Sequence, residues 1–236
     1  MIQGFYSTKN VLLAQQTNID TIANNISNID TNGFKGNRVA FKDALYNAMP
    51  SGDLMPSSAN RQTGTGVVVS ATRIINSQGT IISSENPQDF AIQGSGYFTL
   101  MNGNGEKFYT RNGMFQASEE NGKEYLVTTQ GYYVLGKDGN KISMTENLKE
   151  KLNVVTFPNP EGLQQNGGNN YSSTVASGLP VLSADGIILQ GKYEASNVDL
   201  AQEMTRLIRA SKAFSLASKV ITVADEMEAT TNSLRT

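Results

Sequence analysis

The first apolar pattern of the chain lies in residues 5–29. Apolar residues recur every seven positions at Phe5, Leu12, Ile19 and Ile26, and a companion row contains Ile22 and Ile29 but is interrupted by Thr8 and Gln15. Side chains at this spacing form one narrow stripe on a helix, typical of a coiled-coil seam rather than of a helix in a globular core. The pattern therefore predicts an N-terminal helix that needs a partner along one side.

A polar segment ends this pattern. Asn25 and Asn28 are poor helix-interior residues because their amides compete for backbone hydrogen bonds. Gly33 can adopt the positive φ that often follows a helix end. We expect the helix to end between Ile26 and Asp30 and the chain to turn at Gly33.

A second stripe of the same spacing lies near the other end of the chain, and it contains Leu200, Met204, Leu207, Phe214, Ile221 and Met227. Just before it, Ser196 is followed three residues later by Asp199, which resembles a capping box. No Gly or Pro interrupts residues 197–233. These features predict a continuous C-terminal helix about 50 Å long, at 1.5 Å per residue.

Most of the chain between the two helices is rich in β-branched and aromatic residues. This composition predicts strands in residues 66–75, 89–101, 107–115, 125–135 and 152–157. Turn-forming sequences separate them, so we expect an antiparallel sheet folded into a sandwich or an open barrel. Two polar stretches, residues 48–66 and 158–180, are expected to form extended loops.

The predicted fold class is α+β, with a coiled-coil layer of two terminal helices and a central all-β domain. We expect a discontinuous helical domain of residues 1–32 and 197–236, a linker and loop region of residues 33–66, and a β domain of residues 67–196. The two stripes can cover each other, but the C-terminal helix is longer by about ten residues. Packing within one subunit, self-assembly and binding to a different helical partner all stay open from the pattern alone.

The residue types that are absent narrow the function classes. The chain has no Cys and no His, which excludes disulfides and removes the commonest general base and metal ligand. Residues 186–193 have the Gly-x4-Gly-Lys spacing of a phosphate-binding loop, but Tyr193 replaces the Ser or Thr that would hold magnesium. The four residues between these glycines are typical of a strand. We therefore predict no enzyme and no catalytic, cofactor-binding or metal-binding residues.

Charge and hydropathy exclude two further classes. Charged residues make up 17% of the chain and the net charge is −2, so no basic excess indicates a nucleic-acid partner. No apolar run approaches the roughly 18 residues of a transmembrane helix. The first residues also lack the pattern of a cleaved secretory signal, and we expect none.

An ordered series of short motifs spans nearly the whole chain. It begins with IANNISNIDTNGFKGNRVAF (22–41) and continues with FKDALY (41–46), GTGV (64–67), SQGTI (77–81), DFAIQGSGYF (89–98), YTRNGMF (109–115), NPEGL (159–163), GKYEASNVDLAQEM (191–204) and KVITVADEM (219–227). Through this series the chain resembles the rod and hook proteins of the bacterial flagellar axial structure, most closely the distal rod members.

The resemblance implies a structural subunit that polymerises into a hollow helical rod and transmits torque from motor to hook. The implied partners are further copies of the chain, other rod and hook subunits, the flagellar type III export apparatus and the ring that surrounds the rod, with no nucleic acid and no membrane insertion. The implied location is the flagellar basal body, reached without a cleaved signal. The absence of Cys suits passage into an oxidising space.

The resemblance also implies roles for residues. The two stripes would form the inner layer of the tube and mediate subunit assembly, and residues 48–66 would bridge neighbouring subunits. A family motif would link this layer to the outer β layer, with Phe34 as an apolar anchor; it contains Asn25, Asn28, Thr31, Gly33, Phe34, Lys35, Ser196 and Asn197.

Two alternatives stay open. A proximal rod protein shares the helices and much of the β region, whereas residues 41–66 and the NPEGL motif favour the distal type. A β-rich ligand-binding module on a helical stalk is the alternative from a different class.

Overall fold

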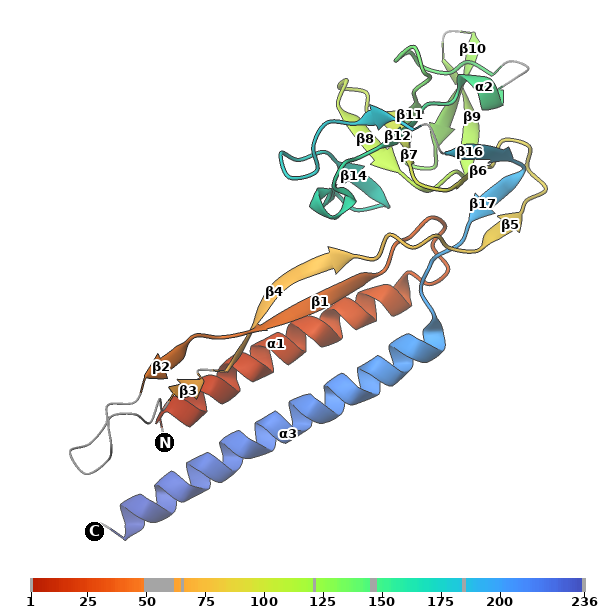
Figure 1. Ribbon diagram of the computed structural model, residues 1–236. Coiled ribbons are helices and arrows are strands. Elements are labelled where there is room, and N and C mark those ends of the chain that lie inside the picture. Colours follow the sequence, from red (N-terminus) through yellow and green to blue (C-terminus); the bar gives the residue numbers. More distant parts are fainter. Residues whose placement is uncertain are drawn as a thin grey trace. The chain divides into compact units, whose positions relative to one another are not determined.

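The computed structural model describes residues 2–48, 62–64, 66–120, 122–144, 148–183 and 186–234. They form two compact units (Figure 1). The helical unit is drawn from residues 1–26, 37–73 and 199–236, and the β body from residues 27–36 and 74–198. The N-terminal helix, the largely antiparallel β region and the C-terminal helix confirm the predicted α+β class.

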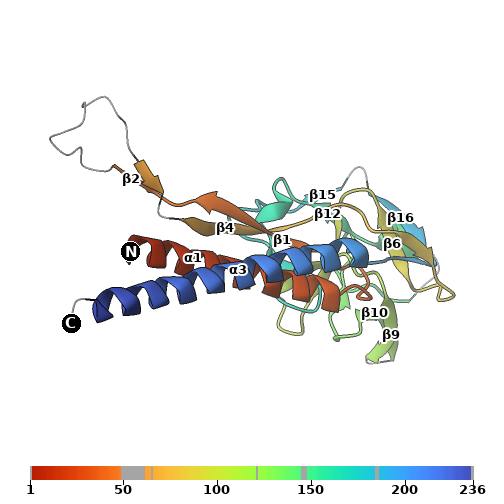
Figure 2. The ribbon, with the colours of Figure 1, turned by 90° about the horizontal axis from the view of Figure 1, so that it is seen from below.

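The helical unit is dominated by two long helices. Helix α1 (Ile2–Ser27) ends where the Asn-rich segment predicts, and helix α3 (Leu200–Ser233) runs for 34 residues without a Gly or Pro. Figures 1 and 2 show the two helices side by side and antiparallel, so that the start of α1 lies beside the end of α3. None of the described helices has the length and apolarity that crossing a bilayer requires.

The start of α3 differs from the sequence prediction. Asp199 is the N-cap, and its carboxylate accepts hydrogen bonds from the backbone N–H groups of Ala201 and Gln202. The Ser196 hydroxyl instead accepts a hydrogen bond from the Val198 N–H, so the predicted capping box is wrong. A carboxylate one residue before the helix stabilises its orphan donors and the positive end of its dipole by itself.

Four strands complete the helical unit. β1 (Asn37–Asp43) pairs with β4 (Val67–Ile74), and β2 (Tyr46–Ala48) pairs with β3 (Gln62–Gly64). The sequence pattern predicts β4 but not β1, because β1 has only one buried side chain, Val39, and little apolar alternation. Residues 49–61, most of the predicted bridging loop, lie outside the described residues.

The β body is built on a nine-stranded sheet. Its main path runs in the order β13 (Gln164–Gln165), β14 (Asn170–Ser172), β8 (Lys107–Thr110), β7 (Tyr97–Met101), β11 (Tyr133–Val134), β10 (Lys123–Thr128) and β9 (Phe115–Glu120). Off this path, β12 (Val154–Thr156) pairs with both β7 and β15 (Val181–Leu182). Every pairing in this sheet is antiparallel, as predicted.

Two small ladders and two short helices complete the β body. β6 (Phe90–Gln93) pairs with β16 (Ile187–Gln190), and β5 (Ile81–Ser83) pairs with β17 (Lys192–Glu194). The short helices are α2 (Leu148–Lys151) and the 3-10 helix η1 (Pro160–Gly162). The phosphate-loop spacing therefore falls on β16 and β17, which confirms the prediction of a strand there.

Four predictions for the β region need correction. The predicted strand 107–115 contains β8 and only the first residue of β9, and the predicted strand 125–135 is divided between β10 and β11. The predicted strand 89–101 is two strands, because Gly94 and Gly96 adopt φ values of 99° and 145° that a strand cannot accommodate. The predicted loop 158–180 contains η1, β13 and β14. The polar composition of this segment gives no sign that β14 pairs with β8. Tyr171, which lies on β14, is buried.

The β body has two apolar clusters. The larger one is centred on Phe90, Phe98, Leu100 and Leu126, none of which exposes more than a trace of surface. The smaller one is aromatic and joins Tyr97, Tyr109, Phe157 and Tyr171 through edge-to-face contacts, with ring centroids 4.8–6.0 Å apart. These clusters bury the apolar face of the sheet within one chain.

Candidate assembly surface and buried junction

The most buried residues of α1 and α3 are mostly small or polar. On α3 the most buried residues are Glu203, Ala210 and Ala217, which are spaced by seven. On α1 they are Ala14, Ile22 and Asn25. Because alanine and glutamate occupy the most buried row of α3, the larger apolar residues of this helix lie beside that row or away from it.

The residues of the predicted stripes occupy different surroundings. Leu12, Ile19 and Ile26 on α1 and Leu207, Phe214 and Ile221 on α3 are half-buried, and Ile22 is buried. Leu200, Met204 and Met227 are exposed by 45%, 45% and 51%. Ile29 is half-buried in the β body, and the Phe5 side chain lies outside the described residues. One subunit thus covers only part of the predicted seam.

Asn25 joins three elements of the helical unit. Its side-chain N–H group donates to the Asn37 carbonyl at 2.8 Å and to Glu203 Oε2 at 3.2 Å, and its Oδ1 accepts from the Asn37 N–H at 2.8 Å. Arg206 donates to the other carboxylate oxygen of Glu203. The amide that weakens the end of α1 therefore fastens that end to β1 and to α3.

The second half of α3 carries an exposed apolar row. Leu216, Val220, Val223, Met227 and Leu234 follow one another at helical spacing, and each exposes at least 51% of its surface. They lie away from the row of Glu203, Ala210 and Ala217. No described residue of the chain buries this row.

The far end of α3 also runs past α1. The hydrogen bond between Asn25 and Glu203 fixes the antiparallel register of the two helices. Since both helices rise 1.5 Å per residue, this register puts Ile2 about level with Glu226. Residues 227–234 therefore extend beyond the described part of α1.

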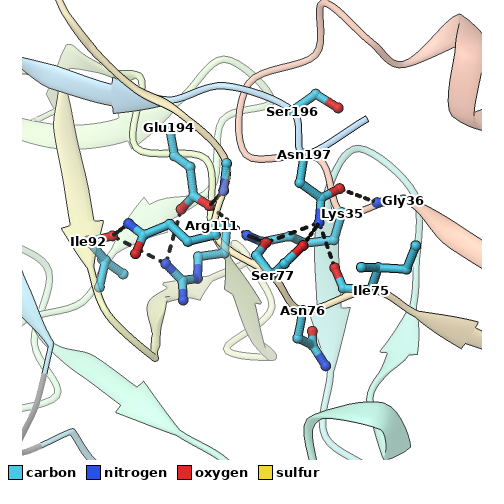
Figure 3. Close-up of polar contacts among 12 residues, drawn as sticks. Lys35, Gly36, Ile75, Asn76, Ser77, Ile92, Arg111, Glu194, Ser196 and Asn197 are labelled. Carbon is cyan, nitrogen blue, oxygen red and sulfur yellow. Dashed lines mark hydrogen bonds and ion pairs between the residues drawn. The ribbon is translucent and has the colours of Figure 1, made fainter. Parts of the chain in front are cut away.

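The β body contains a buried ionic junction around Glu194 (Figure 3). One carboxylate oxygen accepts from Lys35 Nζ at 2.5 Å and from the Gly79 N–H at 2.8 Å, and the other accepts from Arg111 Nη1 at 3.0 Å. Lys35, Arg111 and Glu194 are exposed by only 1%, 5% and 1%. The junction joins four segments that are far apart in the sequence.

Backbone carbonyls complete the junction. Lys35 Nζ also donates to the Ser77 carbonyl at 2.8 Å, and Arg111 donates to the carbonyls of Ile92 and Gly94. Burial lowers the pKa of Lys35, and the Glu194 carboxylate acts against that shift. Two buried cations share one buried anion, so removal of the carboxylate would leave like charges without compensation.

Asn197, three residues after Glu194, joins its own segment to those of Lys35 and Ser77. Its Oδ1 accepts from the Gly36 N–H at 2.8 Å, and its side-chain N–H group donates to the carbonyls of Ile75 and Ser77 at 2.7 and 3.0 Å (Figure 3). Phe34, the predicted anchor, is buried, and its carbonyl accepts from the Asn197 N–H. Phe34 and Asn197, which belong to motif segments far apart in the sequence, therefore contact each other inside the β body.

Gly33 makes the turn that the sequence predicts. Its φ is +70°, and its N–H donates to the Glu194 carbonyl at 2.7 Å. A Cβ at this position would lie 2.5 Å from the Asn112 nitrogen. Both the backbone angle and the close approach therefore require glycine.

The junction includes partners that sequence reasoning did not single out. The family motif supplies Lys35 and Asn197. Glu194 and Arg111 lie within longer sequence motifs that do not mark them individually, and Glu203 lies in the first turn of α3. Asn28 and Thr31 form a local turn in which the Thr31 hydroxyl donates to Asn28 Oδ1. A charged residue inside a strand or an apolar motif, such as Glu194 after Tyr193, is the signal that could have found them.

Among the described residues no group of three acidic side chains could hold a metal ion. The two main features of the described residues are the buried ionic junction around Glu194 and the exposed apolar row of α3.

Comparisons with known proteins follow the same segments. Family models described as "Flagella basal body rod protein", "Flagellar hook protein FlgE/F/G D1 domain" and "Flagellar basal body rod FlgEFG protein C-terminal" match residues 9–35, 91–158 and 189–234. These matches cover most of α1, the centre of the β body and α3. They define the class as a subunit of the flagellar rod and hook type.

Curated relatives match over nearly the full length. The flagellar basal-body rod protein FlgG of Agrobacterium fabrum is 37% identical, over 91% of this chain and 92% of its own. Those of Buchnera aphidicola subsp. Schizaphis graminum and Caulobacter vibrioides are 35% and 34% identical, over 96% and 99% of this chain and 97% and 100% of their own. The chain belongs to the family of flagellar basal-body rod proteins, which locates it in the flagellar basal body and confirms the resemblance.

Proposed function

We propose that the protein is a non-catalytic structural subunit of the distal flagellar rod, which self-assembles into a hollow helical shaft and transmits torque from motor to hook. The two terminal helices form a coiled-coil inner layer, and the β body, folded as a sandwich or an open barrel, forms the outer layer. Full-length similarity to proteins named FlgG supports the distal rather than the proximal type.

The observation on which this proposal depends is the exposed apolar row of α3. Burying apolar surface contributes roughly 25 cal/mol per Å², so a row of five exposed aliphatic side chains strongly favours association. Residues 227–234, which extend past α1, add surface that the chain's own N-terminal helix does not reach. Further copies of the chain, other rod and hook subunits and the export apparatus are the partners of this assembly.

The proposal is tested by polar substitution of the row in the full-length protein. Leu216→Ser, Val220→Ser and Val223→Ser are combined, and polymer formation is followed by sedimentation and electron microscopy. These positions are already exposed by 63%, 56% and 51%, so the monomer should keep its circular dichroism spectrum. We expect the variant to stay monomeric at concentrations at which the unchanged chain forms rods.

A matched control changes the same helix on another side. Ser215→Ala and Ser218→Ala alter two exposed residues outside the apolar row, and we expect this variant to form rods normally. Rod formation by the triple serine variant at the normal concentration would refute the proposed role of the row. A stable monomeric stalk carrying a ligand-binding β body would then be the better account.

A further inference from the structure

A basic pocket lies on the helical unit, between α1, β1 and α3. It has a volume of about 370 Å³, and its apolar lining comes from Ile22, Val39, Ala210 and Ala213. Arg38, Arg206 and Arg209 stand at the same pocket. A second pocket of about 400 Å³ shares Arg206 and Arg209 and continues the hollow along the start of α3.

The charge of this pocket is only partly compensated. Arg206 donates to Glu203, whereas Arg38 and Arg209 form no ion pair with any described residue. The pocket therefore presents two exposed guanidinium groups beside an apolar lining. An acidic segment with a protruding apolar side chain is the ligand that this combination fits.

The far end of α3 has that chemistry. Asp225, Glu226 and Glu228 are exposed and form no ion pair with any residue that the structure describes. Met227, exposed by 51%, lies among them. A methionine is slender and adaptable, so it can enter a small apolar hollow while flanking carboxylates meet arginines at its rim.

The pocket and this end cannot meet within one chain. Arg209 and Met227 belong to the same straight helix and are about 27 Å apart, at 1.5 Å per residue. Two different patches on one molecule that fit each other make a head-to-tail contact, which propagates into a filament instead of closing as a dimer. A second copy of this chain can bring its acidic end to the pocket, whereas the chain's own end cannot.

We propose that the acidic end of α3, centred on Met227, docks in the arginine-lined pocket of the next copy. This inference rests on the proposed function and specifies which surfaces make one of its contacts. The electrostatic part orients the incoming subunit, and the apolar row adjoining Met227 supplies the area.

The test uses the absence of Cys from the chain. Full-length Ala213→Cys and Met227→Cys variants are made separately, mixed in equal amounts, assembled and treated with diamide as oxidant. A disulfide requires Cα atoms within about 7 Å. We expect a cross-linked pair of one copy of each variant in the mixture, and less than a tenth as much cross-linking in either variant alone.

Charge reversal gives an independent measurement. Arg38→Glu with Arg209→Glu should raise the critical concentration for assembly at least tenfold, as should Glu226→Lys with Glu228→Lys. In a mixture, the acidic pocket of the first variant can bind the basic end of the second, and the unchanged pocket of the second can bind the unchanged end of the first. If the two variants alternate, every contact is complementary, so the mixture should have a lower critical concentration than either variant alone. Lys219→Glu, which reverses an exposed charge outside the pocket, is the control and should assemble normally.

The outcomes separate this inference from the proposed function. If the unchanged chain forms rods but the mixed cysteine variants give no cross-link and the reversals do not change assembly, the docking contact is wrong and the rod function stands. If the unchanged chain forms no rods under any condition that assembles its relatives, the proposed function fails, and the inference fails with it.

Discussion

In the β body, Phe90, Phe98 and Leu100 are completely buried, whereas in the helical unit Leu216, Val220 and Val223 each expose more than half of their surface. The first unit buries two apolar clusters within one chain, although Leu179, Val181, Leu182 and Ile187 stay exposed in it, and the second leaves a row along one helix uncovered. A unit with a closed core can fold alone, but helices with an open stripe derive most of their stability from partners. The difference fits the proposal that the β body folds within one chain and that the helical unit is stabilised by neighbouring subunits in the polymer.

The largest expected effect comes from breaking the buried junction of the β body. Glu194→Gln leaves Lys35 and Arg111 buried without their shared anion, and we expect the free energy of unfolding of the body to fall by about 3–5 kcal/mol. Urea unfolding followed by tyrosine fluorescence measures it. Glu120→Gln, which removes a surface carboxylate paired with Lys141, is the control and should change little. Equal stability of the two variants would show that the junction does not hold the body together.

The next effect concerns the turn at Gly33. Gly33→Ala forces a side chain into φ +70° and within 2.5 Å of the Asn112 nitrogen, so we expect a loss of about 1–3 kcal/mol. Gly103→Ala is the matched control, because a Cβ there meets nothing within 4 Å. Chemical unfolding of both variants tests the comparison. A Gly33→Ala protein as stable as the control would contradict the geometry of the turn.

A smaller effect is expected on the helical side of the comparison. Asn25→Ala removes the side-chain hydrogen bonds to the Asn37 backbone and to Glu203, at a cost of about 1–2 kcal/mol. Hydrogen exchange should speed up at the end of α1 and in β1, and stay unchanged in the β body. The exposed neighbour substitution Asn24→Ala serves as control. Faster exchange throughout the β body would mean that the two units do not unfold separately.

The smallest expected effect on stability near neutral pH comes from the ionisation of buried tyrosines. At alkaline pH this ionisation should distinguish the β body from the helical unit. Burial raises the pKa of Tyr97, Tyr109 and Tyr171 above the usual 10.0. A group whose folded pKa is raised contributes stability that is present below its unfolded pKa and is lost as pH rises toward its folded pKa. We therefore expect the β body to lose stability above about pH 10. Tyrosinate absorbance against pH measures this.

Tyr171→Phe sharpens the alkaline prediction. The substitution keeps the buried ring and removes the ionisable hydroxyl, so the loss of stability above pH 10.0 should become less steep. An unchanged slope would show that this tyrosine does not contribute to the alkaline transition.

The sequence predicts the positions of the two helices better than it predicts which of their residues are buried. Heptad spacing was enough to predict α1, and heptad spacing together with the absence of Gly and Pro was enough to predict α3, because helix formation is governed by local periodicity. The same spacing could not show that Ala210 and Ala217, rather than Leu207 and Phe214, would be the most buried, since burial depends on how the two helices face each other. The proposed assembly roles of the stripe residues stay predictions.

In the β region, prediction failed where partners are distant in sequence. β14 pairs with β8 although about sixty residues separate them, and its local composition is that of a loop. Likewise, Lys35, Arg111 and Glu194 look like ordinary charged residues until three distant segments meet. Gly33 was predictable because its requirement is local.

Hydrogen exchange on the full-length protein, as dilute monomer and as polymer, tests the central claim most directly. We expect amides of the central sheet, such as those of β7 and β8, to be protected equally in both states. Amides in the second half of α3 should exchange in the monomer and become at least a hundredfold more protected in the polymer. Equal protection of α3 in both states would contradict the view that its apolar row is covered only by neighbouring subunits.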